Sequence, residues 1–313
     1  MANLTLLDWA KRTDPDGSAP IIANLLSQTN EILLDATYVQ GNLPTGHRVT
    51  IQTGLPEVYY RALNEGVPTS KATTAQVDEA CAILEARSEV DIDLAMLNGN
   101  SAEFRLGEAR MFIEAMNQKM ASAMFYGNPA NDAKEFLGIA PRYSELTGAG
   151  NSSNVLSAGG ASADKQTSIY MLCWSDQTCF CPFPKGSNAG LLQEDLGRQT
   201  SFDAPAHSSG ASGTRMEVMA ERFQWKSGLV IKDWRYAVRI CNIGTDAGDT
   251  NAIVDLGGTM APGDSSFNNI LHLMMKAVAR IPNLNMGRCA FYMNRTVFAG
   301  LMRTALEKST SVL

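Results

Sequence analysis

The chain has 313 residues, of which 45% are hydrophobic and 19% are charged, and its formal net charge at pH 7 is −6. This composition provides enough apolar side chains for a buried core and argues against a disordered chain or a coiled coil. The acidic balance argues against a protein that grips nucleic-acid phosphates, and no apolar run is long enough to cross a membrane.

The cysteines are irregularly spaced, form no C-x-x-C pattern, and lie at Cys81, Cys173, Cys179, Cys181, Cys241 and Cys289. The first residues lack the basic and apolar regions of a signal peptide. We therefore expect free thiols in a reducing cytoplasm.

The first segment predicts two short helices, over residues 5–11 and 20–35. The first of them carries Leu6, Leu7 and Trp9. Because such short helices are not stable alone in water, each must dock on its own subunit or on a neighbour.

A strand is predicted over residues 48–53 and a returning strand over residues 74–84, joined by a long polar tip. Gly66, Pro68, Thr69 and Ser70 lie near the end of this tip. An isolated hairpin is only marginally stable in water. The hairpin therefore either folds back on its own domain or projects onto a partner, and the local sequence leaves both open.

The clearest helix is predicted over Ser101–Tyr126, where apolar residues recur at steps of three and four. Later segments predict short strands alternating with helices, which indicates a mixed α+β fold. They comprise a hairpin of residues 168–174 and 179–183, a strand pair within 216–231, a strand over 233–243, a helix over 266–279, a strand over 288–293 and a helix over 294–307.

No nucleophile elbow, phosphate-binding loop or zinc-protease pattern occurs in the sequence. The histidines His47, His207 and His272 are far apart, which favours surface or packing roles. Cys179 and Cys181 would share one face of a strand, so a metal site or a nucleophile is conceivable there together with Cys173. Small buried side chains are the favoured interpretation.

An acidic cluster of Glu89, Asp91 and Asp93 precedes the long helix. Carboxylates so close together can bind calcium or perform acid–base chemistry. Negative charge is also favourable at the start of a helix, and we favour that interpretation. We therefore expect no catalytic residues, no metal and no cofactor.

A series of segments in a characteristic order covers almost the whole chain, at residues 48–67, 70–71, 88–91, 126–129, 136–139, 185–187, 228–236, 239–243 and 291–295. Their order resembles the major capsid proteins of short-tailed double-stranded DNA bacteriophages. It implies the Hong Kong 97-type capsid fold, which is α+β and has an N-terminal arm, an extended loop, a peripheral domain with a long spine helix, and an axial domain.

The resemblance also implies a division of the chain into these parts. The expected parts are the arm over 1–44, the extended loop over 45–90, the peripheral domain with its spine helix over 91–149, the first axial part over 150–215, peripheral strands over 216–243 and the second axial part over 244–313.

By the same resemblance, the protein is expected to be a non-enzymatic shell subunit. Copies of it would form hexamers and pentamers of an icosahedral head around packaged double-stranded DNA, without sequence-specific binding. The head would assemble in the host cytoplasm and become the virion. The implied partners are other copies of the chain, a cement protein, a portal and a scaffolding protein, and no membrane.

The expected contacts between subunits are at the loop tip (Gly66, Pro68, Thr69, Ser70 and Lys71) and in the arm (Leu6, Leu7 and Trp9). No residues are singled out for a covalent cross-link between Lys and Asn. Two alternatives remain open at this point. One is a bacterial nanocompartment shell of the same fold, and the other is a cytoplasmic enzyme acting through Cys179 and Cys181.

Overall fold

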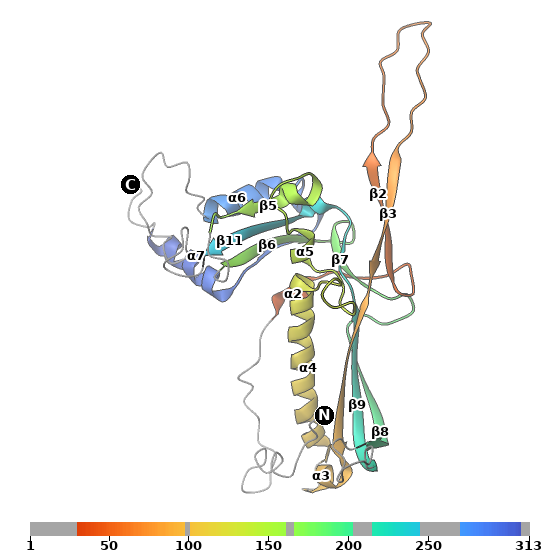
Figure 1. The fold of residues 1–313 in the computed structure, drawn as a ribbon, viewed down its shortest axis with the longest axis vertical. Helices are drawn as coiled ribbons and strands as arrows, with labels where there is room; N and C mark the ends of the chain where they lie inside the picture. Colours follow the sequence, from red (N-terminus) through yellow and green to blue (C-terminus); the bar gives the residue numbers. More distant parts are fainter. Residues whose placement is uncertain (1–29, 98–100, 161–165, 203–214, 245–269, 308–313) are drawn as a thin grey trace. The chain divides into compact units, whose positions relative to one another are not determined.

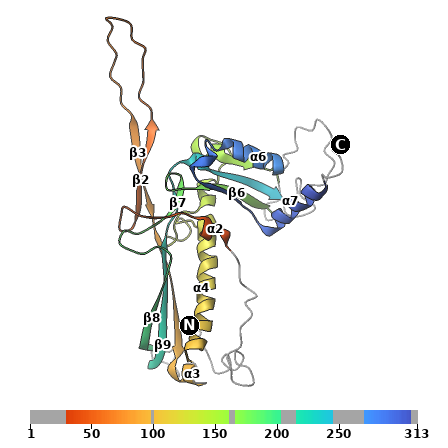
Figure 2. The same cartoon turned by 180° about the vertical axis from the view of Figure 1, so that it is seen from behind.

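The structure is a computed structural model, shown from two sides in Figures 1 and 2. The chain divides into two compact units. Among the described residues, the first comprises Asn30 and Glu31 together with Ala82–Ser122 and Gly186–Ser227, and the second comprises Ile32–Cys81, Ala123–Lys185 and Gly228 onward. The structure describes residues 30–97, 101–160, 166–202, 215–244 and 270–307.

The first unit is a three-stranded antiparallel sheet with a long helix along it. The strands β4 (Ala82–Asp91), β9 (Arg215–Ser227) and β8 (Leu191–Phe202) follow in that order across the sheet. The helix α4 (Ser101–Tyr126) has the predicted bounds and runs beside these strands in both views (Figures 1 and 2). A short helix, α3 (Ile92–Met96), follows β4.

The apolar stripe of α4 is what attaches the helix to the sheet. Ala109 and Met116 are buried against Phe223 of β9, and the rings of Phe112 and Phe223 stack with centroids 5.8 Å apart. Arg105, on the same helix, forms ion pairs of 2.7 Å with Asp195 of β8 and with Glu221 of β9. The helical period predicted from the sequence therefore corresponds to the face that is buried.

The second unit is built on a seven-stranded sheet in which parallel and antiparallel pairs are mixed. The main path is β1–β7–β6–β11–β5, while β10 pairs with β7 and β12 pairs with β6. The strands are β1 (Tyr38–Gln40), β5 (Val155–Ser157), β6 (Gln166–Trp174), β7 (Cys179–Phe183), β10 (Val230–Ile231), β11 (Ala237–Gly244) and β12 (Arg288–Tyr292).

Helices cover this sheet, and β6 lies at its centre. Every residue of β6 from Ile169 to Trp174 is buried, which is typical of a strand covered on both faces. Ile270, Leu273 and Ala277 form the buried side of α6, which packs against β11. The helices of this unit are α2 (Glu31–Asp35, from Ile32), α5 (Ile139–Arg142), α6 (Ile270–Arg280) and α7 (Arg295–Glu307).

The predicted hairpin of residues 168–174 and 179–183 is wrong. Both segments are strands, but β6 and β7 pair only at Trp174 and Cys179, and in parallel. The two edges of β6 are already occupied by β11 and β12. β7 therefore pairs in parallel with β1 and antiparallel with β10.

The predicted strand pair within residues 216–231 is also wrong, because β9 and β10 belong to different sheets. Gly228 lies between them, where a Cβ atom would come within 2.7 Å of the carbonyl oxygen of Ala80. The predicted strand over residues 74–84 is interrupted at Cys81, and its last residues belong to β4. Strand β8 lies within the expected axial part 150–215, yet it pairs with β9 in the first unit.

Phe223→Ala should destabilise the chain, because Phe223 is fully buried between α4 and the sheet. Such a truncation costs about 3–5 kcal/mol of unfolding free energy. Phe298→Ala is the matched control, since Phe298 is 54% exposed. Urea unfolding of the unassembled chain measures both, and equal unfolding midpoints for the two variants would contradict this packing.

Candidate functional site

The feature of the second unit with the greatest functional interest is the hairpin of β2 (Gly46–Gly54) and β3 (Thr73–Ala80). The strands are antiparallel and form the hairpin that the sequence predicts, and their register places Val49 opposite Val77. Figure 1 shows that residues 55–72 continue beyond the paired strands as an extended loop, here named the tip.

The tip exposes apolar side chains to solvent. Leu63 is 94% exposed and Tyr60 is fully exposed, and the other large apolar side chains exposed there are Leu55, Val58, Tyr59 and Val67. The five residues predicted as contacts, Gly66, Pro68, Thr69, Ser70 and Lys71, are all exposed as well. Exposed apolar groups gathered in one segment are typical of a surface that contacts another molecule.

Hydrogen bonds between residues of the tip itself define its path. The Ser70 hydroxyl donates to the Glu57 carbonyl at 2.6 Å, the Tyr59 hydroxyl donates to the Glu57 carboxylate, and the Glu65 amide donates to the Ala62 carbonyl at 3.3 Å. Asn64 has a φ of 65°, which an asparagine tolerates at the end of a loop. The tip thus has a defined path while its apolar groups stay exposed.

The base of the hairpin, in contrast, is packed into the second unit. Val49 is buried with Phe180 of β7 and Val230 of β10. The rings of His47 and Phe180 are perpendicular, with centroids 5.2 Å apart. The Lys232 ammonium lies 5.2 Å from the centroid of the Phe180 ring. These contacts fix the direction in which the hairpin leaves its unit.

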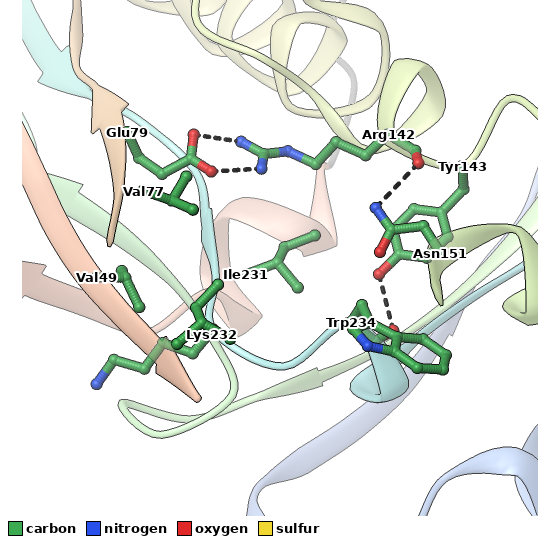
Figure 3. Close-up of a pocket in the computed structure, with 10 residues that line it drawn as sticks. Val49, Val77, Glu79, Arg142, Tyr143, Asn151, Ile231, Lys232 and Trp234 are labelled. Carbon is green, nitrogen blue, oxygen red and sulfur yellow. Dashed lines mark hydrogen bonds and ion pairs between the residues drawn. The ribbon is translucent and has the colours of Figure 1, made fainter. Parts of the chain in front are cut away.

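A paired arginine and glutamate reinforce the base (Figure 3). Arg142 of α5 donates through Nη1 and Nη2 to the two carboxylate oxygens of Glu79 on β3, at 2.6 and 2.7 Å. The two side chains are only 10% and 13% exposed. Arg142 also donates to the carbonyl of Leu229 at 3.1 Å, so the Arg142 guanidinium connects β3 to the segment before β10.

A pocket of about 160 Å³ lies beside this pair and is lined by Val49, Tyr143, Asn151, Lys232 and Trp234 among others. The Tyr143 hydroxyl donates to the Trp234 carbonyl at 2.9 Å, and the Asn151 amide donates to the Arg142 carbonyl at 3.2 Å. Burial raises the pKa of Tyr143 well above its ordinary value. These hydrogen bonds connect the segments that line the pocket, which indicates a structural role. The cavity is also smaller than a typical small-molecule site.

The thiols considered for catalysis lie in the core of the second unit. Cys179 and Cys181 are fully buried, and burial raises the pKa of each thiol far above its usual range. A thiol with a raised pKa is a poor nucleophile. In the part of the chain that the structure describes, no group of three or more His, Cys, Asp or Glu side chains is arranged to hold a metal ion.

The acidic cluster serves local structure. The Asp91 carboxylate accepts a hydrogen bond of 2.8 Å from the Asp93 amide and caps α3. Glu89 accepts one of 2.5 Å from the Ser201 hydroxyl of β8. The Asp91 cap agrees with the helix-start interpretation, but the helix is the short α3 and not the predicted long helix, while Glu89 serves the sheet instead.

The remaining predicted residues are spread along the chain. His47 lies at the hairpin base and His272 on α6. The arm residues Leu6, Leu7 and Trp9, and also His207, lie outside the described residues.

A model of the family described as Major capsid protein GP7 matches residues 14–313. The chain belongs to this family. It is therefore a bacteriophage major capsid protein, and the resemblance inferred from its sequence motifs is confirmed. Its copies form the shell of a virion.

Solved structures agree with this family. A chain of bacteriophage epsilon15 is 26% identical with a TM-score of 0.77, and the match covers 100% of this chain and 89% of that one. The protein accordingly has the predicted α+β fold of the Hong Kong 97 type. A search of curated proteins found no match to the sequence.

More distant structures match with lower scores. A capsid chain of a native GTA particle matches at 9% identity and a TM-score of 0.48, over 74% of this chain and 96% of that one. The SrpI encapsulin of Synechococcus elongatus PCC 7942 matches at 9% identity and a TM-score of 0.47, over 77% and 97%. Among the described residues, no helix of this capsid protein is both long and apolar enough to cross a membrane.

Sequence reasoning missed the residues that hold the hairpin base. Glu79, Arg142, Phe180 and Val230 come from four separate segments, and nothing in their local sequence indicates that they meet. The only local signal was the alternation in β2, where Val49 is buried between more exposed neighbours. That pattern predicts a buried face but not what covers it.

Arg142→Ala should destabilise the second unit by about 3 kcal/mol, because it leaves the mostly buried Glu79 carboxylate without its partner. Arg48→Ala is the matched control. Arg48 pairs with Asp78 on the same hairpin, but both side chains are about half exposed and screened by solvent, so its loss should cost far less than the loss of Arg142. Urea unfolding measures both variants, and an equal cost would contradict the role assigned to Arg142.

Proposed function

We propose that the chain assembles into the hexamers and pentamers of an icosahedral head that encloses packaged double-stranded DNA, and that its role is structural rather than catalytic. The observation that carries this proposal is the tip, whose apolar side chains Tyr60 and Leu63 are exposed on a hairpin with a well-packed base. In a shell, a neighbouring copy covers the tip.

Assembly through a projecting segment follows from the symmetry of shells. A contact in which one surface of a subunit meets a different surface of the next is heterologous, and such contacts close into rings. The same contact can close rings of five and of six. A stable contact of this kind buries more than roughly 1,000 Å², and a long extended loop supplies such an area without a large globular face.

The charge of the chain suits a container for DNA. With a net charge of −6, the wall repels the phosphates mildly and does not hold the packaged DNA in place. We propose that the chain encloses the DNA without sequence-specific contacts to it. The match to a family described as major capsid protein favours a virion over a nanocompartment.

Further partners follow from the resemblance to phage capsid proteins. We infer that the head assembles in the host cytoplasm with a scaffolding protein and a portal, and that a separate cement protein reinforces it. The arm, with Leu6, Leu7 and Trp9, would add a second contact to a neighbour.

The two units suggest how the parts of the fold map onto the chain. We propose that the first unit, with α4 as the spine helix, is the peripheral domain, and that the sheet of the second unit is the axial domain. The hairpin β2–β3 with its tip would be the extended loop, shorter than residues 45–90 because β4 pairs with β9.

Replacing Tyr60 and Leu63 together by Ser should prevent closed shells without lowering the stability of the chain. Both side chains are exposed, so the substitution should change the unfolding free energy by less than about 0.5 kcal/mol. Negative-stain electron microscopy and size-exclusion chromatography measure assembly, and urea unfolding measures stability.

Glu65→Gln is the control, because it changes the same tip without removing apolar surface. The proposal expects shells from the natural chain and from Glu65→Gln, and rings or monomers from the double variant. Normal shells from the double variant would show that the tip is not the contact. A natural chain that remains monomeric at high concentration would overturn the proposed assembly itself.

A further inference from the structure

Two cysteines that lie outside the hairpin and its base face each other in the sheet of the second unit. Cys173 lies on β6 and Cys289 lies directly opposite it on β12, in an antiparallel pair of strands. Side chains of directly opposite residues point to the same face of a sheet. The two Sγ atoms are 2.6 Å apart, against about 2.05 Å in a disulfide bond.

We propose that Cys173 and Cys289 are an oxidisable thiol pair that closes a disulfide staple between β6 and β12 when the protein meets a peroxide. Both cysteines are free in the structure. Forming the disulfide requires only a small movement of the two Sγ atoms toward each other. The backbone pairing of β6 with β12 keeps the two strands in register.

The two thiols differ in access, which sets the order of the reaction. Cys173 is fully buried, whereas Cys289 is partly exposed. The Cys289 Sγ lies 3.7 Å from the Leu284 carbonyl, at the edge of the sheet. A dissolved oxidant therefore reaches Cys289 first, and Cys173 is the resolving thiol. Burial and the neighbouring Cys289 raise the pKa of Cys173 to about 12, which also argues against Cys173 as the thiol that attacks the peroxide.

The reaction balances with hydrogen peroxide as the oxidant. The Cys289 thiolate attacks one peroxide oxygen, the O–O bond breaks, and the products are Cys289 sulfenic acid and hydroxide, which takes up a proton to form water. The Cys173 sulfur then attacks the sulfenic sulfur, the S–O bond breaks, and a second water leaves with the Cys173 proton. Two thiols have lost two electrons, and peroxide has gained them.

The disulfide would attach the edge strand β12 covalently to β6, whereas noncovalent contacts hold β12 in the reduced protein. At the far end of β12, the Tyr292 hydroxyl accepts a hydrogen bond of 2.8 Å from the Trp174 indole and donates one of 2.9 Å to Asp35. Arg288 forms an ion pair of 2.7 Å with the same aspartate. A covalent bond at Cys289 would make the dissociation of β12 impossible without breaking the chain or the bond.

The timing suits a particle that leaves a cell. Thiols stay reduced in a cytoplasm and are oxidised outside it. This timing rests on the proposed virion role, whereas the bond itself depends only on the two cysteines. The bond can therefore be tested on the full chain whether or not the chain assembles.

The experiment treats the purified full-length chain with hydrogen peroxide and compares it with the reduced chain. Peptide mass spectrometry without reduction should detect the Cys173–Cys289 cross-link, and thiol alkylation should show that two thiols are lost per chain. The melting temperature should rise by about 5 °C, because the bond closes a long loop of chain, and it should fall again on reduction.

The variants separate the staple from a general effect of oxidation. Cys289→Ser should fold normally, because Cys289 is partly exposed, and it should lose both the cross-link and the rise in melting temperature. Cys241→Ser is the control, since Cys241 lies on β11 and should leave both unchanged. A cross-link between other cysteines, conversion of Cys289 to sulfinic acid without a cross-link, or a rise that persists in Cys289→Ser would each overturn the proposal.

Discussion

Apolar side chains are exposed to water at the end of a hairpin whose base is anchored in the second unit. Burying a large apolar side chain stabilises a protein by about 1.5–3 kcal/mol, so a tip that leaves Tyr60 and Leu63 in water forgoes that stabilisation. In the assembly we propose, a neighbouring copy covers the tip and that stabilisation is recovered. The hairpin is then one half of an interface whose other half is on a second chain.

A projecting contact works only when its base is rigid. Two sets of contacts supply that rigidity by joining β2 and β3 to three other segments of the second unit. They are the apolar cluster of Val49, Phe180 and Val230 and the ion pair between Arg142 and Glu79. The tip itself is held by hydrogen bonds between its own residues, such as that from Ser70 to Glu57. In the proposed hexamers and pentamers, a firm base and a self-supporting tip would let the contact adapt to rings of different size while its direction stays defined.

The elements that the sequence predicted well depend on residues close together in the chain. The helix over Ser101–Tyr126 follows from apolar residues at steps of three and four, and the hairpin β2–β3 follows from two strands with one loop between them. The family resemblance likewise rests on short segments in order. These signals are local, so one sequence is enough to read them.

The failures concern pairings between distant segments. β7 was expected to pair with β6, but β6 has both edges occupied by β11 and β12, which come much later in the chain. Nothing within residues 168–183 reveals that competition. The contact between Cys173 and Cys289 was missed for the same reason, since it requires the register of β12 on β6. Register is set by tertiary packing rather than by the strand sequence alone.

Amide hydrogen exchange of residues 55–72, measured on the unassembled chain and on shells of the same protein, tests whether another copy covers the tip. We expect rapid exchange in the unassembled chain and strong protection in the shell, while α4 is equally protected in both. Equal and rapid exchange of residues 55–72 in the two samples would contradict the claim that another copy covers the tip.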